Sequence, residues 1–368
     1  MRISWPMWRP AGPIGNDDPS AGRGGRSEEY KKMKRNMNEW LESQLGCGQK
    51  RPLPILSFPG TQLIGKTVEE LVKDGRLQAQ CMEAVAGRFD IGAAFSLMDL
   101  SVEAEAFGAE VLYSPDEIPA LHQALIEDEE QAEALRIPEI GAGRTGECIR
   151  GIRIASERIT DRPVFAGIIG PYSLAGRLLD MTEIMILCRI DPGMVATVLE
   201  KATRFLIRYA AALKEAGANG IVMAEPAAGL LSPELIAEFS NPYVERVRAA
   251  VEDEHCLFLY HNCGNTVPLL KEMAALPVRA YSFGNAIDLE KMLKQLPEDR
   301  LIIGNIDPVN VLRKGTPDRI RRETHALLER CGKYPNFVLA SGCDIPPQTP
   351  MENLDAFFEA ARDFSYDR

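Results

Sequence analysis

The sequence lacks the features that would place this chain in a membrane, outside the cell or on a nucleic acid. It has no run of about 18 apolar residues, the length that a membrane-spanning helix needs. Its start, MRISWPMWRPAGP, lacks the apolar core of a secretory signal peptide. The net charge is −11 and no basic stripe is interleaved with aromatic side chains, so nucleic-acid binding is not expected.

A disulfide framework is also missing. Eight cysteines in 368 residues do not form a disulfide-rich pattern. Without a signal peptide the expected compartment is the reducing cytoplasm, where thiols stay free. Most of these cysteines fit a buried position, as Cys188 does after the apolar run Ile184–Leu187.

The composition that remains is that of a globular protein, with 45% hydrophobic and 26% charged residues. The first residues are rich in Gly, Pro, Ser and Arg and lack periodic apolar spacing. We therefore predict that residues 1–32 are a disordered N-terminal extension and that residues 33–368 form a single domain.

Short apolar runs alternate with longer segments of helical period along this domain. Eight such runs are present: Leu53–Phe58, Asp90–Met98, Val164–Ile169, Gly220–Ala224, Cys256–Tyr260, Ala280–Phe283, Leu301–Ile303 and Phe337–Ala340. The alternation predicts an α/β fold with a parallel sheet, and eight units predict a TIM (β/α)₈ barrel. A doubly wound open sheet is the rival, although no G-x-G-x-x-G turn follows a strand.

Helices are predicted between these runs. Capping residues before a proline start them over Pro192–Ala216 and Ser232–Glu252, and a further helix is predicted over Met351–Asp363. Residues 100–160 are too long for one crossover. They predict an insertion between strands two and three, with helices over Pro115–Leu135 above the barrel mouth.

In a TIM barrel the chemistry gathers just after each strand, at one shared face. Strand five runs into His261-Asn262-Cys263, and a spacing of two residues puts the imidazole and the thiol on one side. Strand eight runs into Gly342-Cys343, which brings a second thiol to the same rim. Glu225 ends strand four, beside strand five.

This donor set suits zinc, a borderline-soft ion. Three protein ligands, His261, Cys263 and Cys343, would leave a fourth position open, as in catalytic rather than structural zinc sites. The alternative is a buried histidine with unrelated core cysteines. Glu225 could be a resting fourth ligand or the catalytic acceptor of a proton, or it could cap a neighbouring helix.

Four segments resemble the uroporphyrinogen decarboxylase superfamily. They are GPYSLAGRLLD (170–180), ANGIVMAEPAAGLLSPELIAEFSNPYVERV (218–247), IIGNIDP (302–308) and LASGCDIPPQTPMENLDAFFEAAR (339–362). Their order and spacing match over roughly residues 50–363. The resemblance implies a TIM barrel and one of two activities, namely decarboxylation of uroporphyrinogen III or methyl transfer in the cobamide-dependent branch.

The site residues favour the methyltransferase branch. Decarboxylases bind substrate carboxylates with an arginine-bearing loop after the first strand, and here that loop, Ser57–Gln62, contains no arginine. Cys343 stands where the decarboxylases have a histidine. The methyltransferases carry His-x-Cys after strand five and Cys after strand eight as zinc ligands, which His261, Cys263 and Cys343 match.

The resemblance therefore implies a methylcobamide:coenzyme M methyltransferase-like enzyme that moves a methyl group from a methylated corrinoid protein to a thiol. No D-x-H-x-x-G cobalamin signature occurs, so the corrinoid is expected on a partner protein that docks on the rim loops. The family permits a monomer or a homodimer. A uroporphyrinogen decarboxylase and a non-catalytic member that binds a tetrapyrrole or corrinoid remain as alternatives.

Four more rim residues have both a functional and a packing interpretation. Asp99 matches the pyrrole-binding, catalytic aspartate of the decarboxylases, and it could equally cap a helix over Leu100–Phe107. Tyr172 could stack on a flat cofactor ring beside the reacting group, or pack in the core. Asn285 and Asn305 follow strands six and seven as candidate cofactor contacts, although Asn305 could instead hold its turn.

Overall fold

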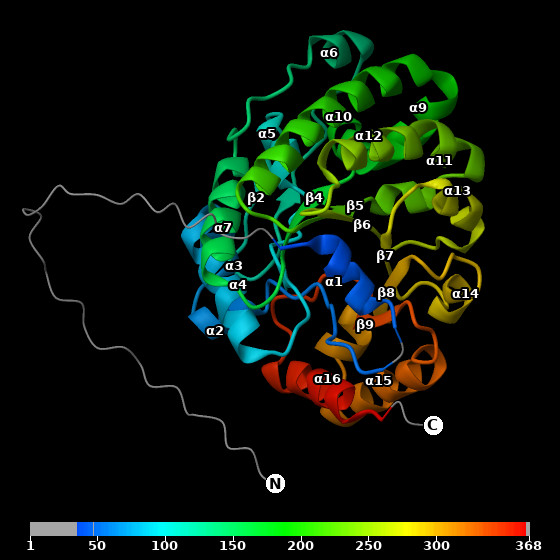
Figure 1. Cartoon of the computed structure of the whole chain (residues 1–368). Coiled ribbons are helices and arrows are strands. Elements are labelled where there is room, and N and C mark those ends of the chain that lie inside the picture. The colour runs from blue at the N-terminus through cyan, green and yellow to red at the C-terminus, as the bar shows by residue number, and fades with distance from the viewer. Residues whose placement is uncertain (1–34, 47, 366–368) are drawn as a thin grey trace, which may run out of the picture. The chain divides into compact units, whose positions relative to one another are not determined.

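The structure is a computed structural model that describes residues 35–46 and 48–365 (Figure 1). The extension predicted over residues 1–32 lies outside the described residues. From Arg35 onward the chain forms one unit, built on a seven-stranded parallel sheet whose neighbours follow chain order. Its strands are β1 (Ala94–Phe95), β4 (Val164–Ile169), β5 (Gly220–Ala224), β6 (Leu257–Asn262), β7 (Ala280–Phe283), β8 (Leu301–Ile306) and β9 (Phe337–Ser341).

The fold is the predicted TIM barrel, but its first predicted strand is wrong. Residues 53–58 form no regular strand, because Pro52 and Pro54 lack the amide hydrogens that a ladder needs. The segment still closes the barrel. Leu53 donates its amide to the carbonyl of Leu339 in β9 at 2.9 Å, and Gly92 donates to the carbonyl of Pro52 at 2.9 Å on the other side.

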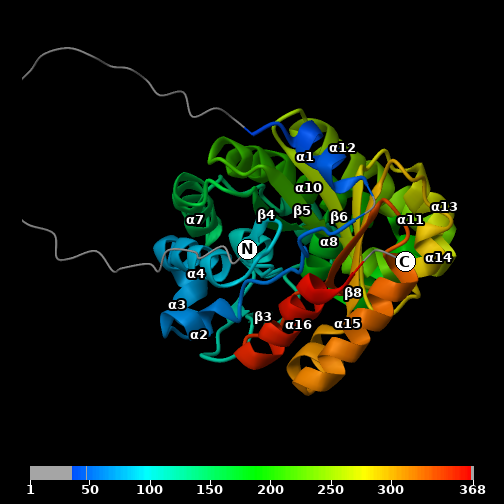
Figure 2. The same cartoon turned by 60° about the horizontal axis from the view of Figure 1, so that its bottom comes forward.

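Helices cover the outside of the strands (Figure 2). The longer ones are α4 (Gly75–Arg88), α7 (Thr145–Arg158), α10 (Pro192–Glu215), α12 (Asn241–Val251), α15 (Pro317–Cys331) and α16 (Met351–Asp363). The predictions over Pro192–Ala216 and Met351–Asp363 are confirmed. Asp191 caps α10 by accepting from the amide of Met194. With helices outside and packed side chains inside, the strands are buried along almost their whole length.

One helix lies across the end of the barrel at which the strands begin. Helix α1 (Met37–Gln44) starts at Asn36, whose side chain accepts from two backbone amides of the first turn. The amide of Met37 donates to the carbonyl of Glu254 just before β6, at 2.7 Å. The Trp40 ring lies edge-on to Phe165 of β4, with 5.5 Å between centroids. This end is therefore closed, and the opposite end is left for chemistry.

The connections at that opposite end are short and irregular. The helix predicted over Pro115–Leu135 is wrong, since the structure has a hairpin, β2 (Val111–Leu112) with β3 (Ala120–Leu121), and then the short helix α6 (Glu129–Ala134). The helix predicted over Ser232–Glu252 is broken at Ser240. The other connecting elements are α2 (Gly60–Ile64), α3 (Val68–Lys73), α5 (Val102–Ala106), α8 (Pro171–Leu179), α9 (Met181–Ile190), η1 (Pro226–Leu230), α11 (Pro233–Phe239), η2 (Val267–Leu269), α13 (Leu270–Ala275), α14 (Leu289–Leu293) and η3 (Pro308–Arg313).

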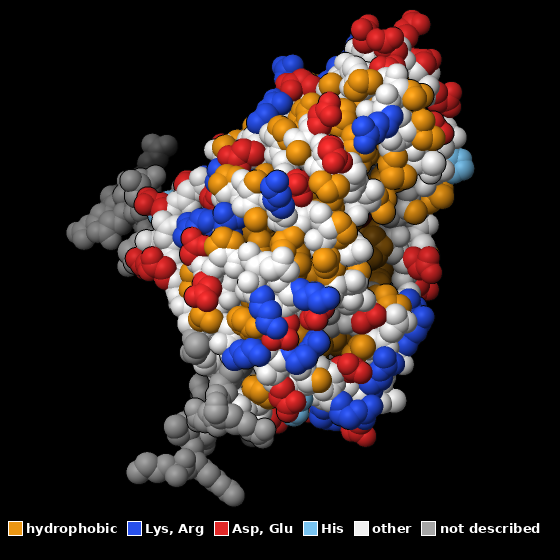
Figure 3. Space-filling model, turned by 90° about the vertical axis from the view of Figure 1, so that its right-hand side faces the viewer, with side chains coloured by type: hydrophobic (Ala, Val, Ile, Leu, Met, Phe, Trp, Pro, Cys, Tyr) orange, Lys and Arg blue, Asp and Glu red, His pale blue; other side chains and the backbone are white. Residues whose placement is uncertain are grey.

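Exposed hydrophobic side chains gather on these connections. Among the described residues, the large ones that stay most exposed all lie in segments that follow β1, β4, β5, β6 or β8, and we call them the apolar rim: Leu112, Ile118, Ile186, Ile190, Leu230, Val267 and Val309. Figure 3 shows hydrophobic side chains around a hollow on the side that carries α11, α13 and α14. No described helix is long and apolar enough to cross a membrane.

Candidate metal centre

The end of β6 is held rigidly by its neighbour β5. The carbonyl of His261 accepts from the amide of Glu225 at 2.9 Å. Between His261 and Cys263, the side chain of Asn262 donates to the carbonyl of Glu225 at 2.8 Å and accepts from the amide of Gly264 at 2.9 Å. Because Asn262 is turned toward β5, the residues on either side of it share the other direction.

Two glycines let the loop after β9 approach this strand end. A side-chain carbon on Gly284 would lie 2.5 Å from Cα of Cys263. One on Gly342 would lie 2.6 Å from the amide nitrogen of Asn285. Either contact is too close for any other residue without a backbone shift. The glycines therefore bring Cys343 up against the end of β6.

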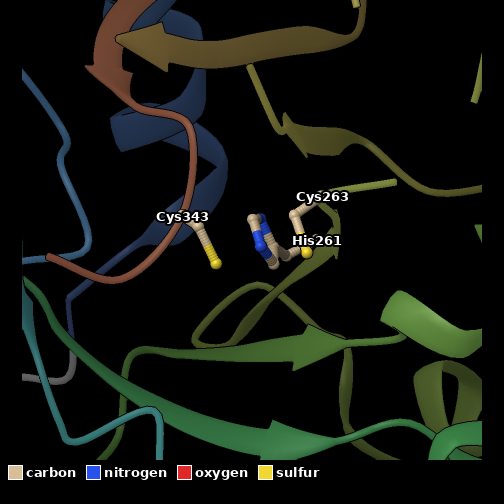
Figure 4. Close-up of side chains that lie close together, drawn as sticks. All are labelled: His261, Cys263 and Cys343. Carbon is tan, nitrogen blue, oxygen red and sulfur yellow. The ribbon is translucent and has the colours of Figure 1, made fainter. Parts of the chain in front are cut away.

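The three predicted ligands meet here (Figure 4). His261 Nε2 or Nδ1 and the Sγ atoms of Cys263 and Cys343 all lie within 4.8 Å of one another. Ligand atoms around a tetrahedral zinc ion are about 3.3 to 3.8 Å apart, so a small inward movement would complete the geometry. His261 is buried and both thiols are half-buried, which leaves one side of the group open.

The imidazole of His261 is oriented for binding a metal. Its Nδ1 lies 3.0 Å from Oγ of Ser282 in β7, and its Nε2 is buried without a hydrogen-bond partner. A buried polar atom left unpaired costs free energy unless something binds it. A metal ion would satisfy Nε2, and Ser282 would be its outer support. No sequence pattern singled out Ser282. It lies opposite His261 in the register of β6 and β7.

The two thiols interact directly. A hydrogen bond from Cys343, helped by His261, holds the pKa of the Cys263 thiol well below its usual range. The same contact raises the pKa of Cys343 well above its usual range. One thiolate therefore forms readily, and the second proton is retained until a cation replaces it. This donor set of one imidazole and two thiols fits zinc.

Glu225 lies outside this group. Glu225 directly follows β5 and is fully buried. Its carboxylate lies against the first turn of α8, where it accepts hydrogen bonds from the amide of Tyr172 at 3.0 Å and from that of Ser173 at 2.6 Å. Burial raises its pKa to about 7 in spite of these bonds. The helix-capping alternative is thus what the structure shows. Its carboxylate is not among the ligand atoms that converge, and a metal-ligand role stays a prediction.

Asp99 belongs to a second polar cluster at the ends of β1 and β4. Its carboxylate forms an ion pair with Arg144 and accepts from the amide and hydroxyl of Ser101, at 3.0 and 2.6 Å. It does not cap α5, which begins at Val102. Arg144 comes from the insertion before α7, so sequence spacing gave no sign of the pair. The catalytic role of Asp99 stays a prediction.

The three remaining candidates are not among the residues whose ligand atoms converge. The Tyr172 ring is buried and its hydroxyl lies 3.8 Å from Sγ of Cys188. Tyr172 therefore packs in the core, the second of its two predicted roles. Asn305 donates its side-chain amide to the carbonyls of Gly284 and Ile287, at 2.9 and 3.0 Å. These bonds stabilise the turn, which is the structural role predicted for Asn305. Asn285 is exposed. Their cofactor contacts stay predictions.

Known proteins share this fold and long stretches of this sequence. A methylcobamide:CoM methyltransferase, MtbA from Methanosarcina acetivorans, is 28% identical over 281 residues, which cover 73% of this chain and 78% of that protein. The methylcobamide:CoM methyltransferase MtaA from Methanosarcina barkeri is 32% identical over 222 residues, covering 59% and 63%. A solved methyltransferase structure from Methanosarcina mazei has a TM-score of 0.78 and 25% identity, covering 87% of this chain and 94% of the other.

The family model described as uroporphyrinogen decarboxylase (URO-D) matches residues 56–364. This match includes every strand and all three residues of the metal group. The chain belongs to the uroporphyrinogen decarboxylase (URO-D) family.

Proposed function

We propose that this protein is a zinc-dependent methyltransferase that moves a methyl group from a methylated corrinoid protein to a thiol such as coenzyme M. One observation carries the proposal, namely that His261, Cys263 and Cys343 converge at the barrel mouth while Nε2 of His261 lacks a partner. The names of the relatives MtbA and MtaA point to the same reaction.

Each residue of the group has a defined task. Ser282 holds the imidazole of His261 through Nδ1, which leaves Nε2 available to a metal ion. Cys263 and Cys343 supply negative charge that balances a divalent cation. A bound zinc ion supplies Lewis acidity, which lowers the pKa of an incoming thiol so that it can act as a nucleophile at neutral pH. The half-buried position of both cysteines leaves an approach for that thiol.

The methyl donor would arrive on a separate protein, because this sequence has no D-x-H-x-x-G signature. The apolar rim supports docking of that protein over the metal group, since its residues all lie on the connections after the strands. Exposed apolar side chains rimmed by polar ones mark interaction sites.

A decisive experiment supplies the zinc-loaded protein with methylcobalamin and 2-mercaptoethanesulfonate under anaerobic conditions. We expect a methylated thiol to accumulate, and zinc removal by a chelator to abolish the reaction. A protein that binds no zinc and decarboxylates uroporphyrinogen III would contradict the proposal. Bound zinc without methyl transfer to any thiol would favour the non-catalytic corrinoid-binding alternative.

A further inference from the structure

Helix α8 carries one side chain that differs from all its neighbours. Eight of its nine residues are buried, and Arg177 is the exception, with partial exposure. Among the described residues no acceptor forms a hydrogen bond or an ion pair with its guanidinium. Its nitrogen atoms are not among the fully enclosed polar atoms that lack a partner. The guanidinium therefore reaches solvent-accessible space from a largely buried stem.

Arg144 in the same region shows what a satisfied arginine looks like. Its Nε donates to Glu105 at 2.7 Å, one terminal nitrogen pairs with Asp99, and the other donates to Ser101 at 2.7 Å. Asp99 is therefore already neutralised by Arg144. Burial lowers the pKa of Arg177, and the negative charges of Asp99 and of the buried Glu103 only partly offset this effect. A largely desolvated cation that forms no hydrogen bond or ion pair with an anion is costly.

The position of Arg177 relates it to the metal centre. Helix α8 directly follows the carboxyl end of β4, the end of the barrel at which the metal group also lies. Helix α8 is also anchored at its start to Glu225, whose backbone amide bonds to His261. The strand ends that hold the metal group thus also hold the first turn of this helix, at the same end of the barrel.

We propose that Arg177 binds the anionic group, a sulfonate or a carboxylate, of the methyl acceptor while the acceptor's thiol lies at the metal centre. A guanidinium presents a planar fork of N–H donors that matches such anions. The anion would offset the cost of burying the cation. This inference rests on the proposed function, because it assigns the remainder of the same acceptor molecule.

The test compares two thiols with the same two-carbon chain, 2-mercaptoethanesulfonate and neutral 2-mercaptoethanol. Their dissociation constants are measured by titration calorimetry on zinc-loaded protein, which requires no methyl transfer. We expect the wild type to bind the sulfonate more tightly, and Arg177→Gln to weaken sulfonate binding by roughly 10- to 100-fold while leaving mercaptoethanol unchanged. Arg177→Lys should retain part of the preference.

Arg322→Gln is the matched control, because Arg322 is exposed on the outer helix α15 and its loss removes the same charge. Its sulfonate affinity should equal that of the wild type. Equal binding of both thiols by the wild type, or equal weakening of both in Arg177→Gln, would overturn the proposal and leave Arg177 a structural counterion of Asp99 and Glu103. A sulfonate preference in a protein that transfers no methyl group would support Arg177 and count against the proposed function.

Discussion

Two halves of the barrel mouth differ in what their polar side chains bind. At the ends of β6 and β9, His261 and two thiols face one another, and Nε2 of the imidazole has no protein partner. At the ends of β1, β4 and β5, the acids Asp99 and Glu225 are engaged with Arg144 and with the amides of α8. All of these residues follow strands, as site residues in barrels do.

The difference shows that position after a strand does not by itself make a site. A polar side chain whose hydrogen bonds are already made within the protein holds the loops in place. A group of converging side chains that lacks such partners is free to bind an ion or a ligand. The first half is therefore assigned to the metal, and the second half to the support of the helix and loop that border it. The following substitutions test this division.

The largest effect is expected from Cys263→Ser and from Cys343→Ser. Either change removes a thiolate ligand, so zinc should be lost and thiol methylation should fall by roughly 1,000-fold or more. Zinc content by mass spectrometry and methyl-transfer rates measure this. Cys331→Ala, on the outer helix α15, is the control and should keep both zinc and activity. Full zinc content in both serine variants would contradict the assignment.

Glu225→Ala tests the supporting half. The change leaves the amides of Tyr172 and Ser173 without their acceptor. The free energy of unfolding should fall by about 2 to 4 kcal/mol, as measured by urea denaturation. Zinc content should stay near that of the wild type, because the carboxylate caps α8. A variant of unchanged stability that loses zinc would instead make Glu225 a ligand and break the comparison.

Ser282→Ala tests how the imidazole is oriented. Without the hydroxyl, Nδ1 of His261 loses its partner at 3.0 Å. Loss of such an outer partner typically weakens metal binding roughly 10- to 100-fold. Competition with a chromophoric chelator gives the affinity. If Ser282→Ala binds zinc as tightly as the wild type, the hydroxyl does not support the ligand.

Glu103→Gln gives a smaller, pH-dependent effect in the supporting half. Burial raises the pKa of Glu103 to about 7, and one of its carboxylate oxygens has no partner. Because the folded pKa exceeds the unfolded one, wild-type stability is lost as pH rises from about 4.5 through 7. Glutamine does not titrate, so the variant should gain about 1 to 3 kcal/mol relative to the wild type across this window.

Urea denaturation at pH 4.5 and pH 8 measures this gain. Glu225 titrates in both proteins, so its contribution cancels in the difference. A difference that does not change between the two pH values would show that Glu103 is not buried in the way that the structure describes.

The barrel and the metal group could be predicted from the sequence because both depend on local patterns. Apolar runs mark buried parallel strands, and the spacing of His261 and Cys263 puts both side chains on one side of the strand end. The expected barrel brought Cys343, after strand eight, to the same rim, and the family resemblance implied all three as ligands. Helix starts were accurate where a cap and a proline agree, as at Asp191-Pro192 and Ser232-Pro233.

What sequence could not give were contacts between distant segments. Arg144 lies 45 positions from Asp99, so no periodicity links them. Ser282 supports His261 only through strand register. The strand predicted over residues 53–58 failed because two prolines break a ladder that the apolar pattern alone suggests. The helix predicted over Pro115–Leu135 was wrong because the short elements of this insertion lack a repeating apolar pattern.

X-ray absorption at the zinc edge tests the central claim most directly. The zinc-loaded protein should show two sulfur atoms at about 2.3 Å and one histidine nitrogen at about 2.0 Å, with a further light atom. Adding 2-mercaptoethanesulfonate should replace that light atom by a third sulfur. A zinc shell of oxygen atoms alone, or a sulfur count that the thiol leaves unchanged, would contradict the account.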